Sequence, residues 1–182
     1  FLTTTFIMEA LRKNAAKYGL FLGLAMVVAT TLIYAIDLSL FTASWYGIVN
    51  LLIIVGFGVV SSVQNKKAQG GFISFTETFT RFFVTIAIGF FIATLFSILL
   101  FNIIDPDAKR IIAENVVKFT VEMMEKFGAK PGDINNVIKQ MEESDSFGVV
   151  GQLKGFAFNL VIYSIIGLIT ALIVRRERPQ SF

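Results

Sequence analysis

The sequence predicts an all-α integral membrane protein, in which four transmembrane helices carry a two-helix extracytoplasmic insertion between the third and the fourth. Two observations lead to this fold class. First, 16% of the 182 residues are charged and 55% are hydrophobic, whereas an average soluble domain has about 25% charged residues. Second, four uncharged runs each approach the ~20 residues that a helix needs to cross a bilayer. The long polar segment, residues 105–150, lies between the third and fourth runs. A soluble helical bundle with a large core fits these runs less well.

The composition also limits the kinds of catalytic and metal-binding site that the chain can form. The sequence has no Cys and no His, which removes disulfides, thiol nucleophiles, thiolate or imidazole metal ligands and imidazole bases. No charged residue lies within the four runs, and a charge at the bilayer centre usually marks a proton or ion pathway. We therefore expect no enzyme activity, no catalytic or metal-binding residue and no cofactor.

Residues 8–104 are predicted to form the first three transmembrane helices. Met8 is a plausible start, so residues 1–7 are left out of the fold, and residues 8–17 form a short basic segment before the first span. That span has 19 residues, which rise about 28 Å as a helix, close to the ~30 Å hydrocarbon core. Trp45 and Tyr46 open the second run as interfacial aromatics. The three spans are about 18–36, 45–63 and 82–104.

A capping signal precedes the third span. Ser74 is followed three residues later by Glu77, the spacing of a capping box, in which each side chain bonds the other residue's backbone amide. A helix should begin near Phe75, lie at the cytoplasmic interface over about residues 75–81, and continue into the third span. The preceding glycine pair, residues 70–71, is predicted to be a turn, because it lacks the Gly-Lys pattern of a phosphate loop.

Residues 105–150 are predicted to form the extracytoplasmic helical element. Asp105 can cap a helix that has Pro106 at its first position, so we expect a new helix over about 106–127, with a kinked continuation of the third span as the alternative. Gly128 suits the left-handed closing position. Asp133 is predicted to cap a second helix over about 134–143. These acids are expected to cap helices or face water, since their spacing matches no calcium loop.

The two outer helices have an apolar face that is a candidate partner-binding surface. Its residues recur at helical spacing, and they are Ile112, Val116, Met123, Phe127, Ile134, Val137, Ile138 and Met141. The face either docks a partner or packs on the other outer helix or the membrane surface. A partner-binding role for this face is the best functional candidate in the sequence.

Residues 151–182 are predicted to hold the fourth transmembrane helix, about 155–174, and a basic cytoplasmic tail. Four residues in the spans are candidates for helix packing: Gly19, Gly23, Asn50 and Asn159. The glycines stand four apart, which lets two helix backbones approach, either within the bundle or between copies. The two asparagines either bond between helices or line a polar solute site.

The basic residues predict the orientation. Most Lys and Arg lie beside the N-terminal segment, the second loop and the C-terminal tail, whereas residues 105–150 contain nine of the 13 acids. By the positive-inside rule, both termini of this multi-pass chain are cytoplasmic and residues 105–150 are extracytoplasmic. Because the net charge of +3 follows this topology, we expect no nucleic-acid partner.

Three stretches resemble one known family. They are residues 15–19 running into Gly23 (Ala-Ala-Lys-Tyr-Gly), residues 70–75 (Gly-Gly-Phe-Ile-Ser-Phe) and residues 104–107 (Ile-Asp-Pro-Asp). As a set they are similar to domain-of-unknown-function family 4199, small membrane proteins of Bacteroidetes-type bacteria, from Met8 to the fourth span. The resemblance implies a location in the bacterial cytoplasmic (inner) membrane, and it brings no activity, cofactor or catalytic residue.

The predicted function is that of a non-enzymatic accessory or structural membrane protein. It would sit in the lipid bilayer and bind partner membrane proteins, or copies of itself, through its spans and its extracytoplasmic helices. The alternative is a small channel or a solute or lipid transporter that acts as an oligomer, with Asn50, Asn159 and the glycines along the path. An enzyme comes third, because it would need a cluster of polar groups in a cleft, for example around Asp105.

Overall fold

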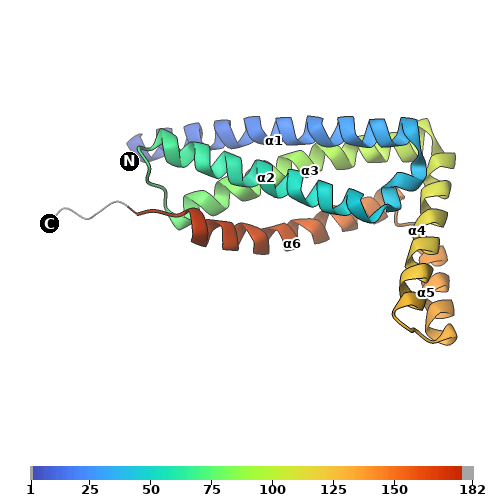
Figure 1. Cartoon of the computed structure of the whole chain (residues 1–182). Helices are drawn as coiled ribbons and strands as arrows, with labels where there is room; N and C mark the ends of the chain where they lie inside the picture. Colours follow the sequence, from blue (N-terminus) through green and yellow to red (C-terminus); the bar gives the residue numbers. More distant parts are fainter. Residues whose placement is uncertain (1, 178–182) are drawn as a thin grey trace.

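The computed structural model describes residues 2–177, with side chains from residue 14 onward. All of its regular elements are helical apart from one isolated bridge. The elements are α1 (Leu2–Ile36), a 3₁₀-helix (Leu38–Thr42), α2 (Ser44–Ala68), α3 (Phe75–Leu99), a π-helical turn (Leu100–Ile104), α4 (Pro106–Lys126), α5 (Pro131–Glu143) and α6 (Val149–Val174). Figure 1 shows α1, α2, α3 and α6 as a long bundle, with α4 and α5 side by side across one end of it.

Four helical segments are long and apolar enough to cross a membrane. They are Asn14–Ile36, Ser44–Ala68, Phe75–Ile104 and Val149–Val174, with mean hydropathies of 2.2, 2.1, 2.5 and 2.3. Large apolar side chains are exposed along the outside of all four, as in Leu52 at 66% and Phe158 at 68%. A helix that is apolar all round and exposed on one side is suited to lipid rather than to water.

Helix α3 is the central element, because it contacts α1, α2 and α6. Its Phe82 is fully buried, and its ring fills the space opposite two glycines: a Cβ at Gly58 of α2 would come within 2.6 Å of the ring, and one at Gly167 of α6 within 2.8 Å. Leu22 of α1 packs against Gly89 of α3 in the same manner. Small residues thus let the other three helices approach α3, which is how membrane helices gain packing contacts.

Local signals set the start of α3. Ser74 Oγ accepts from the Glu77 amide at 3.2 Å, and the Glu77 carboxylate accepts from the Ser74 amide at 2.9 Å. This confirms the predicted capping box. From Phe75 the helix continues without a break through the residues expected at the interface and into the span. Gly70 and Gly71 both have positive φ, 74° and 90°, in the turn before it.

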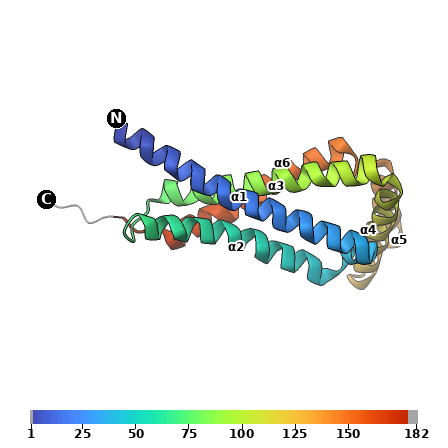
Figure 2. The same cartoon turned by 90° about the horizontal axis from the view of Figure 1, so that it is seen from above.

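The two ends of the bundle differ in charge and in the elements that lie there, and we call them the basic end and the hairpin end. The basic end contains Lys66, Lys67, Arg81, Arg175 and Arg176. There the 69–74 loop is tied to the end of α6, since Ile73 and Arg176 exchange two backbone hydrogen bonds of 2.9 and 2.8 Å, and Lys66 Nζ donates to the Val174 carbonyl at 2.7 Å. The hairpin end is the opposite end, where α4 and α5 lie; Figure 2 shows both of them beyond the ends of the long helices.

The chain breaks at Asp105, which has φ −140° and ψ 81° and whose side chain accepts from the Ala108 amide. Helix α4 is therefore a new helix rather than a kinked continuation of α3. Gly128 has φ 74° after α4, in the predicted left-handed position.

The predicted cap of α5 is wrong. The helix starts at Pro131, its N-cap is Lys130, and no side chain bonds at that cap. Asp133 lies inside the first turn. Proline fixes φ near the helical value and lacks the amide that a cap would satisfy, so it starts the helix by itself. The Asp133 carboxylate still favours the helix because it lies near the positive end of the dipole.

Candidate functional site at the hairpin end

The last turn of the third span is a π-helix, Leu100–Ile104, in which the Asp105 amide bonds the Leu100 carbonyl at 2.8 Å. Leu100 and Phe101 are buried, and they pack with Ala108 and Ile112 of α4. A π-turn holds one extra residue, which changes the direction of the side chains that follow. In this chain the turn carries Asn102.

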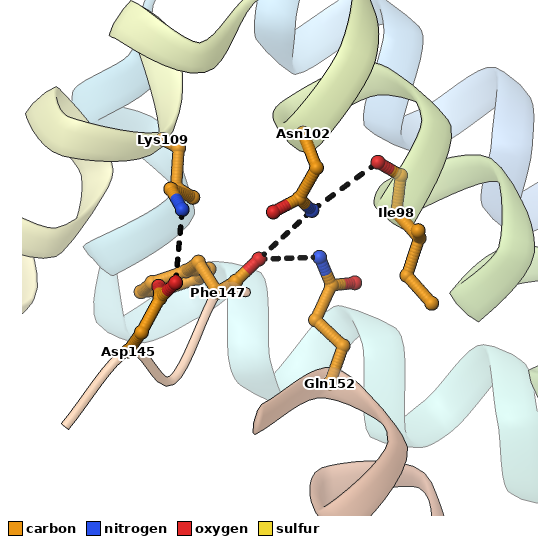
Figure 3. Close-up of polar contacts among 6 residues, drawn as sticks. All are labelled: Ile98, Asn102, Lys109, Asp145, Phe147 and Gln152. Carbon is orange, nitrogen blue, oxygen red and sulfur yellow. Dashed lines mark hydrogen bonds and ion pairs between the residues drawn. The ribbon is translucent and has the colours of Figure 1, made fainter. Parts of the chain in front are cut away.

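Asn102 ties α3 to the segment that connects α5 with α6. Its Nδ2 donates to the Ile98 carbonyl at 3.2 Å and to the Phe147 carbonyl at 3.1 Å. The Phe147 carbonyl also accepts from Gln152 Nε2 at 2.8 Å, so two side chains from different helices meet on one backbone oxygen (Figure 3). We call this group, Asn102, Phe147 and Gln152, the latch. It fixes the connecting segment against both α3 and α6.

A salt bridge adds to the latch. Lys109 Nζ lies 3.0 Å from Asp145 Oδ2 and links α4 to the same connecting segment (Figure 3). The Asp145 side chain is 64% exposed, so the pair contributes at most about 1 kcal/mol. Its main effect is to orient α4 relative to the segment.

Asp105 joins three elements at this end. Its carboxylate accepts from the Ala108 amide at 3.0 Å and from the Tyr34 hydroxyl of α1 at 2.8 Å. The Ala108 amide, followed by the Tyr34 hydroxyl, lowers the pKa of Asp105 below its usual range, because both donate to the charged form. Asp105 is thus a capping and bridging carboxylate.

Two cavities at the hairpin end share Phe147 in their linings. The outer cavity, about 540 Å³, lies between α4, the end of α5 and residues 144–147. The inner cavity, about 260 Å³, lies within the bundle beneath α4. Phe147 and Val116 line both, so the latch bonds the backbone of a residue that the two cavities share.

The linings of the two cavities differ in chemistry. The outer cavity has apolar walls that include Val117 and Met141. Its charged lining residues are Arg110, Glu114, Lys118, Glu142, Glu143 and Asp145. The inner cavity is lined mostly by apolar and aromatic side chains, and its small polar groups are Thr30, Thr94, Ser97 and Gln152. Such a lining suits an apolar or amphipathic group. In the part of the chain that the structure describes, no three acidic, His or Cys side chains are grouped to hold a metal ion.

The residues of the candidate partner-binding face differ in burial and in whether they line a cavity. Ile112 is buried against the bundle, at 1% exposure, and Ile134 is buried at 9%. Val116, Met123, Val137, Ile138 and Met141 are half-buried, and Phe127 is 81% exposed. Val116 and Met141 line the outer cavity. The other half-buried members and Phe127 line neither cavity.

The candidate packing residues lie at two kinds of position. A Cβ at Gly19 would come within 2.7 Å of Ile88 Cβ, and one at Gly23 within 2.8 Å of Ile92, so both glycines of α1 face α3 at close range. Asn159 Nδ2 donates to the Gly155 carbonyl of its own helix at 2.9 Å. Asn50 is half-buried on α2. Neither asparagine lines the inner cavity.

Sequence reasoning did not single out the latch. Asn102 differs from other span asparagines only in its position, three residues before Asp105 and four before Pro106. A polar amide so close to a predicted helix break was the available signal. Nothing in the local sequence linked it to Phe147, which lies 45 residues away.

Comparisons with known proteins agree with the resemblance noted in the sequence. The model of a family described as "Protein of unknown function (DUF4199)" matches residues 17–176. No curated protein and no solved structure matches the chain.

Proposed function

Because this chain belongs to the DUF4199 family, which has no assigned function, we propose a function from its geometry: it is a non-enzymatic accessory protein of a bacterial cytoplasmic membrane. In this proposal it docks other membrane proteins through the α4–α5 hairpin. The observation that carries the proposal is the outer cavity of about 540 Å³ on that hairpin. Cavities of about 300–1,000 Å³ can enclose a ligand-sized group, here an apolar side-chain cluster of the partner.

The attachment of the hairpin supports a docking role. Among the described elements, α5 has its main contacts with α4 alone, and Figure 1 shows both helices extending past the side of the bundle. The latch and the Lys109–Asp145 pair hold the cavity wall in one position. A preformed cavity reduces the entropy lost on binding. Its mixed lining of apolar and charged groups resembles an interface with an apolar centre and a polar rim.

The orientation is part of the proposal. Lys66, Lys67, Arg175 and Arg176 lie together at the basic end, which by the positive-inside rule faces the cytoplasm. The hairpin and its cavity are then extracytoplasmic, where they meet the outer loops of other membrane proteins. The partner is accordingly an integral membrane protein with an apolar outer segment.

Site-specific photo-crosslinking in native membranes tests the docking. A photoreactive residue at Met141 lines the cavity, whereas one at Gln140, the next residue, is exposed and does not line it. We expect a discrete adduct with another membrane protein from position 141 only, and a weaker one when Asn102→Ala removes a latch donor. Equal adducts from both positions, or none from position 141, would contradict the proposal.

The inner cavity favours a second candidate, an oligomeric carrier of a lipid or amphipathic solute. It lies within the bundle and shares Phe147 and Val116 with the lining of the outer cavity. Adducts whose masses are multiples of the 20.2 kDa chain, together with a symmetric oligomer after gentle solubilisation, would support this candidate instead.

A further inference from the structure

The basic end of the bundle contains a buried polar cluster that the proposed function does not use. Its members lie at 0–5% exposure: Ser61, Ser62 and Asn65 of α2, with Thr78, Arg81 and Thr85 of α3. Four of them are hydroxyl residues, and each of these hydroxyls has a hydrogen-bond partner. Ser62 donates to the Thr78 carbonyl at 3.2 Å, and Thr85 donates to Ser61 Oγ at 2.9 Å. The other two members, Asn65 and Arg81, each have a nitrogen donor without a hydrogen-bond partner.

Arg81 and Asn65 both have a donor without an acceptor. Arg81 is 2% exposed and Asn65 is 5% exposed. Among the described residues, Arg81 Nε and Asn65 Nδ2 have no hydrogen-bond partner, and the ion pairs are the Lys109–Asp145 and Arg110–Glu114 pairs at the hairpin end. A buried N–H donor that has no acceptor is unfavourable.

The nearby carboxylate of the same helix is already occupied. The Glu77 side chain accepts from the Ser74 amide at 2.9 Å and from the Ser74 hydroxyl at 3.0 Å. It also accepts from Gln69 Nε2 at 3.5 Å. The capping box directs the Glu77 carboxylate to its neutral donors, so it acts on Arg81 through its charge and leaves Arg81 Nε without an acceptor.

Helix geometry places the two free donors opposite each other. The Ser61–Thr85 bond fixes the register of α2 against α3. The two helices run in opposite directions, so Asn65, four residues after Ser61, and Arg81, four residues before Thr85, both lie one turn nearer the basic end on the facing sides. The Arg81 Nε–H and the Asn65 amide are donors of the kind that bind the oxygens of a tetrahedral anion.

The depth of Arg81 points to a phosphate. The third span has 30 residues, which rise about 45 Å as a helix, longer than the ~30 Å hydrocarbon core. Arg81 lies six residues after Phe75, roughly 9 Å from the start of that helix. This is within the headgroup layer, where phospholipid phosphates lie.

We propose that Arg81 and Asn65 form a binding site for a phosphate group at the basic end of the bundle. Lipid phosphodiester and inorganic phosphate share the chemistry that these donors recognise. Lys66 and Arg176, at the same end, add positive charge around the site. The proposal does not depend on the docking role of the hairpin, which lies at the other end of the molecule.

The test uses the full chain in neutral detergent, with two probes. Inorganic phosphate is titrated against chloride at constant ionic strength while thermal unfolding is followed. In parallel, phosphatidylglycerol is added and retained lipid is counted by native mass spectrometry. Stabilisation by phosphate alone identifies a free anion, and retention of the lipid alone identifies a headgroup; each outcome supports the site.

Variants separate this site from a general attraction of anions. Asn65→Leu keeps the size of the side chain and removes its N–H donor. Arg81→Lys keeps the charge and removes the planar set of guanidinium N–H donors. Each should weaken binding about tenfold. Lys67→Gln removes an exposed cation at the same end and should change binding less than twofold. The proposal is overturned if the wild-type protein binds neither probe, or if Lys67→Gln weakens binding as much as Asn65→Leu does.

Discussion

At the scale of single residues, Asp105 determines where the bundle ends and the hairpin begins. Its carboxylate caps α4 through the Ala108 amide and accepts from the Tyr34 hydroxyl, so one side chain joins the start of α4 to α1. Asp37 has a related local role at the end of α1, where it accepts from the Ser39 amide at 2.8 Å, and this bond lowers its pKa. Both carboxylates act in the charged form.

The first prediction concerns the titration of Asp105. Because its pKa is lowered in the folded protein, the stabilisation is complete above the ordinary aspartate value of about 3.9 and is lost as the pH falls through the lower, folded value. Tyr34→Phe removes one donor and should raise the pKa toward the ordinary value. The measurement is the carboxyl ¹³C shift of labelled aspartate against pH, with the resonance assigned by Asp105→Asn.

Asp107→Asn is the matched control for that titration. Asp107 is an exposed carboxylate in the same helical turn, and its replacement leaves both donors to Asp105 in place. An Asp105 titration midpoint that Tyr34→Phe does not move would show that the hydroxyl does not stabilise the carboxylate.

At the scale of elements, α1 and α3 approach closely because α1 carries glycines where α3 carries β-branched residues. Gly19 faces Ile88, and Gly23 faces Ile92. The isoleucine side chains occupy the space that a Cβ would need, so this contact depends on the absence of a side chain on α1. It also sets the position of Ala15 along α1 relative to Thr85 of α3. The Thr85 hydroxyl lies 3.3 Å from the Ala15 carbonyl.

The second prediction is that Gly19→Ala destabilises the protein by about 1–3 kcal/mol, the usual cost of overpacking. The added methyl would lie 2.7 Å from Ile88 Cβ and 2.9 Å from the Thr85 carbonyl oxygen, and a backbone oxygen cannot move aside easily. Gly47→Ala, on α2 with nothing within 4 Å of the added atom, is the control and should be neutral or slightly stabilising. Reversible unfolding in mixed micelles measures both, and equal effects would refute the close-packing explanation.

At the scale of the whole molecule, the hairpin crosses the bundle end at a steep angle (Figure 1). The four long helices are long and apolar enough to cross a membrane, and in the proposed orientation α4 and α5 would lie along its surface. This arrangement places the outer cavity beside the bundle rather than on its axis. A partner that occupies the cavity would therefore stand next to this protein in the membrane, as the docking proposal requires.

The third prediction is that Asn135 and Glu177 lie on opposite sides of the membrane. Both are exposed, and the chain has no Cys, so Asn135→Cys and Glu177→Cys each introduce a single thiol. A membrane-impermeant maleimide should label the Asn135→Cys variant in intact spheroplasts and the Glu177→Cys variant only after lysis. The reverse pattern would invert the proposed orientation, and labelling of both in intact spheroplasts would contradict the single membrane crossing by α6, which lies between the two positions.

Features that depend on a few neighbouring residues could be predicted from the sequence. The capping box at Ser74 and Glu77, the break at Asp105 and the left-handed Gly128 each follow from local backbone chemistry. The four long apolar helices follow from the length of the uncharged runs. The capping rule gave the wrong position at Asp133, because the nearby Pro131 has the stronger preference for the first helical position.

The sequence by itself determined which segments are helices, where they begin and which of them suit a bilayer, because these properties depend on hydrogen bonds and hydropathy within one segment. Only the tertiary structure decided that Asn102 and Gln152 meet at the Phe147 carbonyl, that Phe147 lines two cavities, and that Arg81 and Asn65 are both buried. These features join residues far apart in the chain, and they depend on the register and crossing of whole helices. That register is set by side-chain packing at positions such as Gly19 and Phe82, and no local pattern specifies which partner such a position will find.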